Sequence, residues 1–135
     1  MKIKVIDFGY EHLPNRAHEN DAGADVFSTI DVVIAPHAVA KIPLGFGLEV
    51  PDGYAGFIFP RSGMSAKGIT AELPPIDSGY RGEVHAILTN NSCTYYRVSK
   101  GDRVGQLVIL PCIIADFVTD NIAQRGDGAF GSTGK

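Results

Sequence analysis

Residues 45–59, GFGLEVPDGYAGFIF, place two short apolar runs on either side of one turn signal. The runs, GFGLEV (45–50) and YAGFIF (54–59), are rich in aromatic and β-branched side chains, which favour strands. The Pro-Asp-Gly sequence at 51–53 is typical of a tight turn. Each run is shorter than an ordinary helix, so this stretch predicts two strands joined by a turn.

The same alternation of apolar runs and turn signals continues along the chain. The other runs are IKVIDF (3–8), DVVIA (31–35), HAILT (85–89) and RVGQLVILPCIIADFV (103–118). Sixteen glycines and eight prolines in 135 residues leave little room for helices. We predict one short helical turn, at Ser62–Lys67, and otherwise an all-β sandwich or barrel.

Composition narrows the classes of partner. No apolar run approaches the length of a transmembrane helix, and the first residues lack the pattern of a secretory signal. A net charge of −3 argues against general affinity for nucleic acid. We therefore expect a cytoplasmic protein with no direct nucleic-acid or membrane partner. Cys93 and Cys112 are not in metal-ligand spacing, so we expect buried free thiols in a reducing compartment.

Five polar or glycine-rich segments lie between or after the runs. They are DAGADVF (21–27), PRSGMSAKG (60–68), IDSGYRGEV (76–84), GDRVGQL (101–107) and RGDGAFGSTGK (125–135). Each has an ordinary structural explanation: Asp21 and Asp25 can be turn residues, and the second segment can be a solvated turn. Ile76 and Val84 bracket the third segment, so we expect Asp77 and Tyr80 to lie in a hairpin.

Two of these segments also carry groups that suit a polyphosphate. Arg61, Ser62 and Gly63 follow an apolar strand and supply a guanidinium, a hydroxyl and a backbone N–H. The last residues supply glycine N–H groups and hydroxyls, yet from Ala123 onward they hold almost no apolar side chains. We therefore divide the chain into a β-barrel domain at 1–122 and a flexible C-terminal arm at 123–135 that something else must order.

Together and in this order, the five segments resemble the five motifs of the homotrimeric dUTPase family. PRSG, ID-x-x-YRG and RG-x-G-x-FGSTG carry the resemblance, which runs from Asp21 to Gly134. It implies a jelly-roll-like β-barrel, a three-fold homotrimer with active sites shared between subunits, and Mg²⁺ as cofactor. The implied reaction is hydrolysis of dUTP to dUMP and diphosphate, which limits uracil incorporation into DNA and supplies dUMP for dTMP synthesis.

The resemblance also implies a role for each matching residue. Asp77 looks like the carboxylate that orients and deprotonates the attacking water, and Tyr80 like the ring under the deoxyribose. Asp25 is similar to an Asp that touches Mg²⁺ through water, while substrate phosphates hold the metal directly. The implied phosphate contacts are Arg61, Ser62 and Gly63, and Gln106 matches a further polar contact with the substrate. The implied lid, which closes over the substrate, comprises Arg125, Phe130, Gly131, Ser132 and Thr133.

Two alternatives and one departure accompany this interpretation. A dCTP deaminase shares the fold but needs a Glu placed for proton transfer, whereas this chain has Asp77 and Tyr80 in dUTPase order. A non-catalytic regulatory module of the same fold would have no use for the C-terminal arm. The departure is Pro75, preceded by Pro74, at the position two residues before Asp77 where the family usually carries a glycine. The resemblance therefore does not fix how this chain recognises uracil.

Overall fold

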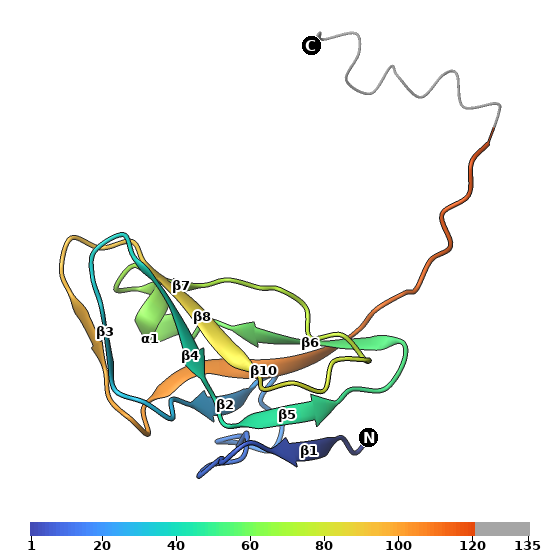
Figure 1. Cartoon of the computed structure of the whole chain (residues 1–135), viewed down its shortest axis with the longest axis horizontal. Helices are drawn as coiled ribbons and strands as arrows, with labels where there is room; N and C mark the ends of the chain where they lie inside the picture. The colour runs from blue at the N-terminus through green and yellow to red at the C-terminus, as the bar shows by residue number, and fades with distance from the viewer. Residues whose placement is uncertain (121–135) are drawn as a thin grey trace, which may run out of the picture.

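The computed structural model describes residues 1–120, which form short strands and a single helical turn (Figure 1). The strands are β1 (Lys4–Asp7), β2 (Ala24–Phe27), β3 (Val32–Ile34), β4 (Val39–Pro43), β5 (Phe46–Glu49), β6 (Tyr54–Phe59), β7 (Ile69–Ala71), β8 (His85–Asn90), β9 (Tyr96–Val98) and β10 (Arg103–Pro111), and the helical turn is α1 (Ser62–Ser65).

Every strand pairs in the antiparallel sense. Strands β2, β10 and β6 form one sheet, with β10 in the centre, and β4, β8 and β7 form another, with β8 in the centre. The pairs β1–β5 and β3–β9 complete the barrel. Buried side chains from both sheets join one hydrophobic core. The prediction of an all-β, jelly-roll-like barrel is confirmed.

Alternation along β8 shows how the sequence builds this core. Ala86, Leu88 and Asn90 are buried, whereas the residues between them are only partly covered. Asn90 is the polar exception. Its amide donates to the carbonyls of Ile34 (2.9 Å) and Thr94 (2.8 Å), and its Oδ1 accepts from the Ser92 N–H (3.0 Å) and hydroxyl (2.7 Å). A fully satisfied buried amide thus ties β8 to β3 and to the following loop.

The last apolar run of the sequence forms a strand over only part of its length. The apolar run at 103–118 stays in the sheet only to Pro111, after which the backbone N–H of Cys112 donates to the Gly53 carbonyl (2.8 Å). Beyond it the chain leaves the barrel (Figure 1), and Ile113 and Phe117 are 91% and 97% exposed. These side chains have apolar character but no place in the core of their own chain.

The expectation of buried thiols is wrong, because Cys93 and Cys112 are both free and exposed. Cys93 lies in the loop between β8 and β9, and Cys112 follows the end of β10, so neither occupies an inward position of a strand. The predicted helical turn at Ser62–Lys67 is confirmed as α1. Within residues 1–120, no helix is long and apolar enough to cross a membrane.

Candidate active site

A β-bulge in β10 determines which side chains share one outer face of the barrel. Arg103 pairs with Phe27 and Gln106 with Asp25, and the register shifts between Arg103 and Gly105. In a regular strand, positions three apart point to opposite faces, but the extra residue brings Arg103 and Gln106 to the same face. Gly105 makes this possible, because an added Cβ would lie 2.7 Å from Cγ2 of Ile58.

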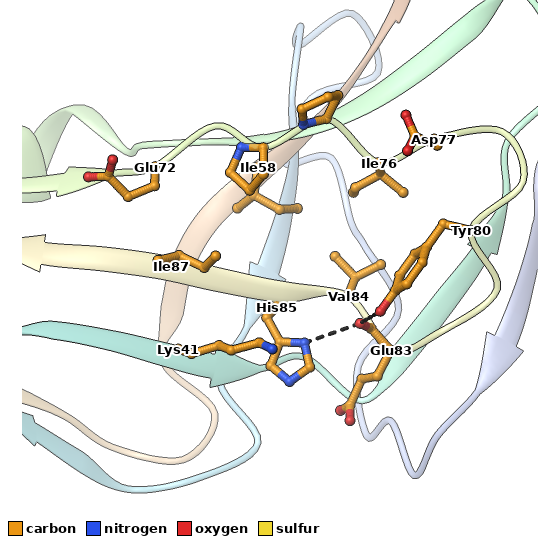
Figure 2. Close-up of a pocket in the computed structure, with 12 residues that line it drawn as sticks. Lys41, Ile58, Glu72, Ile76, Asp77, Tyr80, Glu83, Val84, His85 and Ile87 are labelled. Atoms are coloured by element: carbon orange, nitrogen blue, oxygen red, sulfur yellow. Dashed lines mark hydrogen bonds between the residues drawn. The ribbon is translucent and has the colours of Figure 1, made fainter.

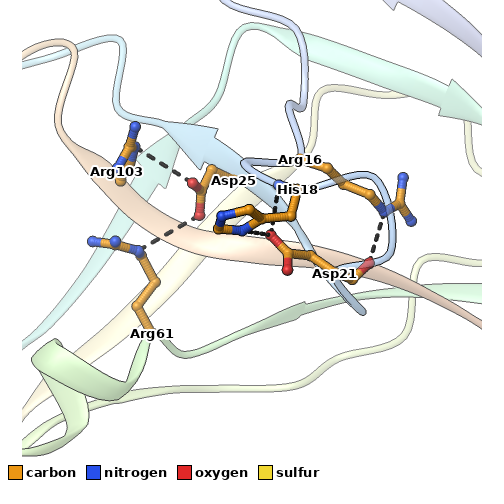
Figure 3. Close-up of polar contacts among 6 residues, drawn as sticks. All are labelled: Arg16, His18, Asp21, Asp25, Arg61 and Arg103. Atoms are coloured by element: carbon orange, nitrogen blue, oxygen red, sulfur yellow. Dashed lines mark hydrogen bonds and ion pairs between the residues drawn. The ribbon is translucent and has the colours of Figure 1, made fainter.

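Asp25 is the centre of the charges on that face. Its Oδ1 lies 3.6 Å from Nε of Arg61, and its Oδ2 lies 3.4 Å from Nε of Arg103 (Figure 3). The Asp25 side chain is only 18% exposed, so both guanidinium groups hold a carboxylate that is largely shielded from water. One carboxylate between two arginines leaves a net positive charge on this part of the surface.

Arg61, Ser62 and Gly63 lie where β6 passes into α1. The hydrogen bonds of this turn begin with the N–H groups of Met64 and Ser65, which donate to the Arg61 carbonyl, so the amides of Ser62 and Gly63 are left outside the turn's own bonding. An added Cβ on Gly63 would meet open space. Backbone donors at this point are therefore accessible to a ligand.

Gln106 is held at the floor of the same region. Its amide nitrogen donates to the Pro60 carbonyl (2.9 Å), and Gly23 packs so closely against it that an added Cβ would overlap the Gln106 side chain. The residues around this hollow form what we call the Arg61 cavity, of about 310 Å³. Its lining comprises Ala17, His18, Asp21, Asp25, Arg61, Ser62, Gly63, Arg103 and Gln106.

The segment that carries Asp77 is a loop and not the expected hairpin. Ile76 exchanges two backbone hydrogen bonds with Gly56 of β6 (2.7 and 3.0 Å), whereas the Val84 N–H donates to Phe46 of β5 (2.8 Å). The two ends of the loop therefore pair with different strands and diverge. Between them lies a second hollow of about 200 Å³, which we call the Asp77 cavity (Figure 2).

The Tyr80 ring is fixed at the edge of the Asp77 cavity. Its hydroxyl donates to the Glu83 carbonyl (2.8 Å; Figure 2). An added Cβ on Gly82 would collide with the ring. The Arg81 guanidinium donates to the Ser78 carbonyl (2.6 Å), and the Tyr80 N–H donates to the Asp77 carbonyl (3.1 Å). These bonds hold the carboxylate and the aromatic ring on one ordered loop.

The opposite wall of the Asp77 cavity is the beginning of β8. The Glu72 N–H donates to the Ile87 carbonyl (2.8 Å), so the polar backbone groups of Ile87 face the β7 side. Those of His85, two residues earlier, face the same side. Strand β7 ends at Ala71, and Pro74-Pro75 opposite have no N–H. The His85 N–H and carbonyl are therefore directed at the cavity.

One chain does not bring the two cavities together. They share no lining residue, and along β6 the Gly56 position beside Ile76 is three residues from Phe59, which pairs with Gln106. That spacing is about 10 Å of strand. Asp25, Arg61, Ser62, Gly63 and Gln106 thus gather in one cavity, and Asp77 and Tyr80 in another. Arg125, Phe130, Gly131, Ser132 and Thr133 lie outside the described residues.

The donor set does not favour direct metal binding by side chains. Within residues 1–120, no three His, Cys, Asp or Glu side chains gather to hold a metal ion. Asp25 is already shared by Arg61 and Arg103, so the protein could touch a hydrated ion there only from outside its first shell. The pKa of Tyr96 is raised, mainly by burial of the phenol and secondly by the Asp102 carboxylate. Tyr96 therefore stays a neutral phenol.

The basic side chains Arg103 and His18 of the Arg61 cavity were not among the site residues predicted from the sequence. Arg103 belongs to the GDRVGQL segment, and its presence there was the available signal, but strict alternation with Gln106 would have placed it on the other face. His18 precedes the first polar segment and carries no recognisable pattern. Both lie close to Asp25 only because the bulge and the 16–21 loop place them there.

Comparison with known proteins gives a consistent family. The family model described as dUTPase matches residues 10–134. The deoxyuridine 5'-triphosphate nucleotidohydrolase of Tropheryma whipplei (strain Twist) is 42% identical over 100% of this chain and 97% of that protein. The protein of the same name from Clostridium tetani (strain Massachusetts / E88) is 43% identical, with the same coverage.

Solved structures agree with the sequence comparison. The dUTPase from phage phi11 of S. aureus superposes with a TM-score of 0.84 at 26% identity, over 90% of this chain and 97% of that one. A dUTPase mutant of Staphylococcus bacteriophage 80alpha with dUpNHpp gives a TM-score of 0.83 at 27% identity, over 89% and 91% of the two chains.

Proposed function

The chain belongs to the dUTPase family, whose reaction is the hydrolysis of dUTP to dUMP and diphosphate, and we propose how its residues divide that work. The prediction of a dUTP diphosphatase is confirmed by this membership. The observation that carries the division of roles is the separation of the cavities: one holds a carboxylate beside an aromatic ring, and the other holds two guanidinium groups.

The Asp77 cavity binds the deoxyuridine part of the substrate. The His85 N–H and carbonyl form a donor–acceptor pair that complements a carbonyl and the N3–H of uracil. The amino group and unprotonated N3 of cytosine would face the wrong partners. Tyr80, held by Glu83, lies under the deoxyribose and leaves no room for a 2′-hydroxyl. Because Pro74 and Pro75 have no N–H to donate, the β8 backbone makes most of the hydrogen bonds to the base in this proposal.

Asp77 is the general base in this proposal. It follows Ile76, whose paired hydrogen bonds to Gly56 fix the start of the loop, and its side chain is exposed to incoming water. An ordinary aspartate is ionised at neutral pH and can accept a proton from the attacking water as the water oxygen bonds to phosphorus and the P–O bond to the departing diphosphate breaks.

The Arg61 cavity binds the triphosphate. Arg61 and Arg103, together with the hydroxyl of Ser62 and the amide of Gly63, offer the cations and donors that a chain of about four negative charges needs. Asp25 keeps both guanidinium groups in place before the substrate arrives. Such positioning is most of what phosphoryl transfer asks of a protein.

Enzymes of this family generally use Mg²⁺, and the residues present fit an ion held mainly by the substrate. Asp25 would contact the water shell of the ion, while Ser62 and Gly63 keep the phosphates in place. When bound, Mg²⁺ neutralises part of the phosphate charge.

A complete site requires more than one chain. Asp77 and Arg61 open into different cavities of one chain, so we propose that the Asp77 cavity of one subunit meets the Arg61 cavity of a second subunit in a homotrimer. The exposed apolar side chains of Ile113, Ile114 and Phe117 support association, because they find no core in their own chain. The arm residues Arg125, Phe130, Gly131, Ser132 and Thr133 then close over the bound nucleotide.

The proposed product and substrate also suggest where the enzyme acts. Removal of dUTP limits uracil in DNA, and dUMP supplies dTMP synthesis, so we place the enzyme in the cytoplasm. The exposed thiols of Cys93 and Cys112 would remain reduced there.

Product analysis tests the proposed function. With Mg²⁺ present, the purified protein should release diphosphate from dUTP in equal amount to dUMP, and it should release no ammonia from dCTP. Ammonia release from dCTP, or no diphosphate from dUTP, would contradict the proposal.

A further inference from the structure

The loop of residues 16–21 forms one wall of the Arg61 cavity. It folds back because Asn15 exchanges two backbone hydrogen bonds with Asp25 of β2 (2.8 and 3.0 Å). Within the loop, Nε of Arg16 donates to the Asp21 carbonyl (2.9 Å), and the Asp21 N–H donates to the His18 carbonyl (3.1 Å). The loop is therefore an ordered wall, although its side chains face water.

His18 is oriented within that wall by Asp21. The Oδ2 atom of Asp21 accepts from the His18 backbone N–H (2.9 Å) and lies 3.3 Å from Nδ1 of the ring (Figure 3). An ionised carboxylate only accepts hydrogen bonds, so Nδ1 carries the hydrogen in this contact. The Nε2 edge of the ring is left for a ligand, and the side chain is 78% exposed.

The charges around the cavity leave room for one more cation. Arg61 and Arg103 are balanced by Asp25 and Asp21, and Arg16 contributes its Nε at the far side of the loop. A triphosphate brings about four negative charges, which exceed the small positive charge of this set. An imidazolium ring carries hydrogens on both nitrogens, so one can serve Asp21 and the other a phosphate oxygen.

We infer that His18 is a further substrate-binding residue, which donates from Nε2 to the phosphate chain of the nucleotide while Asp21 holds its other nitrogen. The inference rests on the proposed function, because it takes the Arg61 cavity to be the triphosphate site. It adds a phosphate contact from the loop of residues 16–21 to the contacts already proposed for Arg61, Ser62 and Gly63.

Equilibrium binding of α,β-imido-dUTP with Mg²⁺ tests this inference, using wild type, His18→Gln, His18→Lys and His12→Gln. His18→Gln keeps the backbone bond to Asp21 but lacks the imidazole ring whose two nitrogens serve Asp21 and the phosphate, so its Kd should rise about tenfold. His18→Lys should restore most of the affinity. His12→Gln is the matched control, because His12 lies in another hollow beside Phe27, and it should bind within about twofold of wild type.

Three further readouts separate the outcomes. In turnover of dUTP, His18→Gln should raise KM and leave kcat near the wild-type value, and its thermal unfolding should be unchanged. If wild type hydrolyses dUTP normally and His18→Gln binds the analogue as tightly as wild type, the inference is wrong while the proposed function stands. If wild type neither binds the analogue nor hydrolyses dUTP, both are wrong.

Discussion

Arg103 and Gln106 project from the same face of β10, although three positions separate them in the chain. The bulge at Val104 and Gly105 absorbs one residue, so both side chains reach the cavity around Asp25. The backbone irregularity therefore builds part of the site: it places a second guanidinium beside Asp25 and keeps Gln106 opposite it.

The substitution Gly105→Ala tests the bulge. The added methyl would lie 2.7 Å from Cγ2 of Ile58 and 3.1 Å from the Phe59 carbonyl oxygen, so the sheet has to shift. We expect a loss of about 1–3 kcal/mol in the free energy of unfolding and a higher KM for dUTP. Denaturant unfolding and steady-state kinetics measure both. Gly79→Ala, which meets open space, controls for stability; equal unfolding of the two variants would contradict the role of Gly105.

The fold was largely predictable from local sequence, and the reason is visible at β5 and β6. Apolar runs and turn residues are local signals, and Gly53 adopts φ = +85° in the Pro-Asp-Gly turn that they indicate. Strand β4 was not predicted, because Val39–Pro43 mixes Lys41 and Pro43 into a run that depends on β8 for its pairing. Its inward side chains only become recognisable once the partner strand is known.

For the site, the sequence indicated candidate residues but not their geometry. Asp77 and Tyr80 could be identified from the order of motifs, but the expected hairpin fails because Ile76 pairs with Gly56 and Val84 with Phe46. Those are contacts between segments far apart in sequence, which no local pattern carries. The same holds for Arg103, whose position depends on a register shift.

The substitution Asp77→Asn tests the general base. The amide preserves shape but cannot accept the proton of the attacking water, so kcat should fall by about a hundredfold or more. KM for dUTP should change little, because the base and phosphate contacts remain. Steady-state kinetics with Mg²⁺ provide the measurement. A variant with near-normal kcat would remove Asp77 from this role.

The substitution Tyr80→Ala tests the choice of sugar. If the ring held by the Glu83 carbonyl lies under the deoxyribose, as we propose, wild type should discriminate strongly against UTP, because a 2′-hydroxyl would meet the ring. Removing the ring should lower kcat/KM for dUTP and narrow the ratio between dUTP and UTP. Tyr80→Phe, which loses only the hydrogen bond, should keep most of the discrimination. An unchanged ratio in Tyr80→Ala would mean that another group reads the sugar.

The substitution Asn90→Ala tests the buried amide that joins β8 to β3. It leaves the buried carbonyl of Ile34 and the partly buried carbonyl of Thr94 without their donors, at a position where the Asn90 side chain itself is fully buried. We expect a loss of about 2–4 kcal/mol in the free energy of unfolding. Asn91→Ala is the matched control: Asn91 is exposed, its side-chain amide donates to the Thr70 hydroxyl (3.1 Å), and its backbone bond to the Gly68 carbonyl survives the substitution, so about 0.5 kcal/mol is expected. Similar losses in both variants would argue against the network.

The central claim is that one active site combines Asp77 of one chain with Arg61 of another. Asp77→Asn removes the carboxylate of the Asp77 cavity, and Arg61→Ala removes the guanidinium of the Arg61 cavity. We expect both variants to be inactive, because neither homotrimer contains a complete site. In a cyclic mixed trimer of either composition, one interface in three joins an intact Asp77 to an intact Arg61.

The decisive measurement is therefore dUTP hydrolysis by trimers co-expressed from the two variants and purified through a different tag on each chain. Random assembly makes about three quarters of the trimers mixed, so the unfractionated sample should recover about one quarter of the wild-type activity. The doubly tagged trimers should recover about one third. Verified mixed trimers that remain inactive would contradict the claim and place Asp77 and Arg61 in the same chain's site.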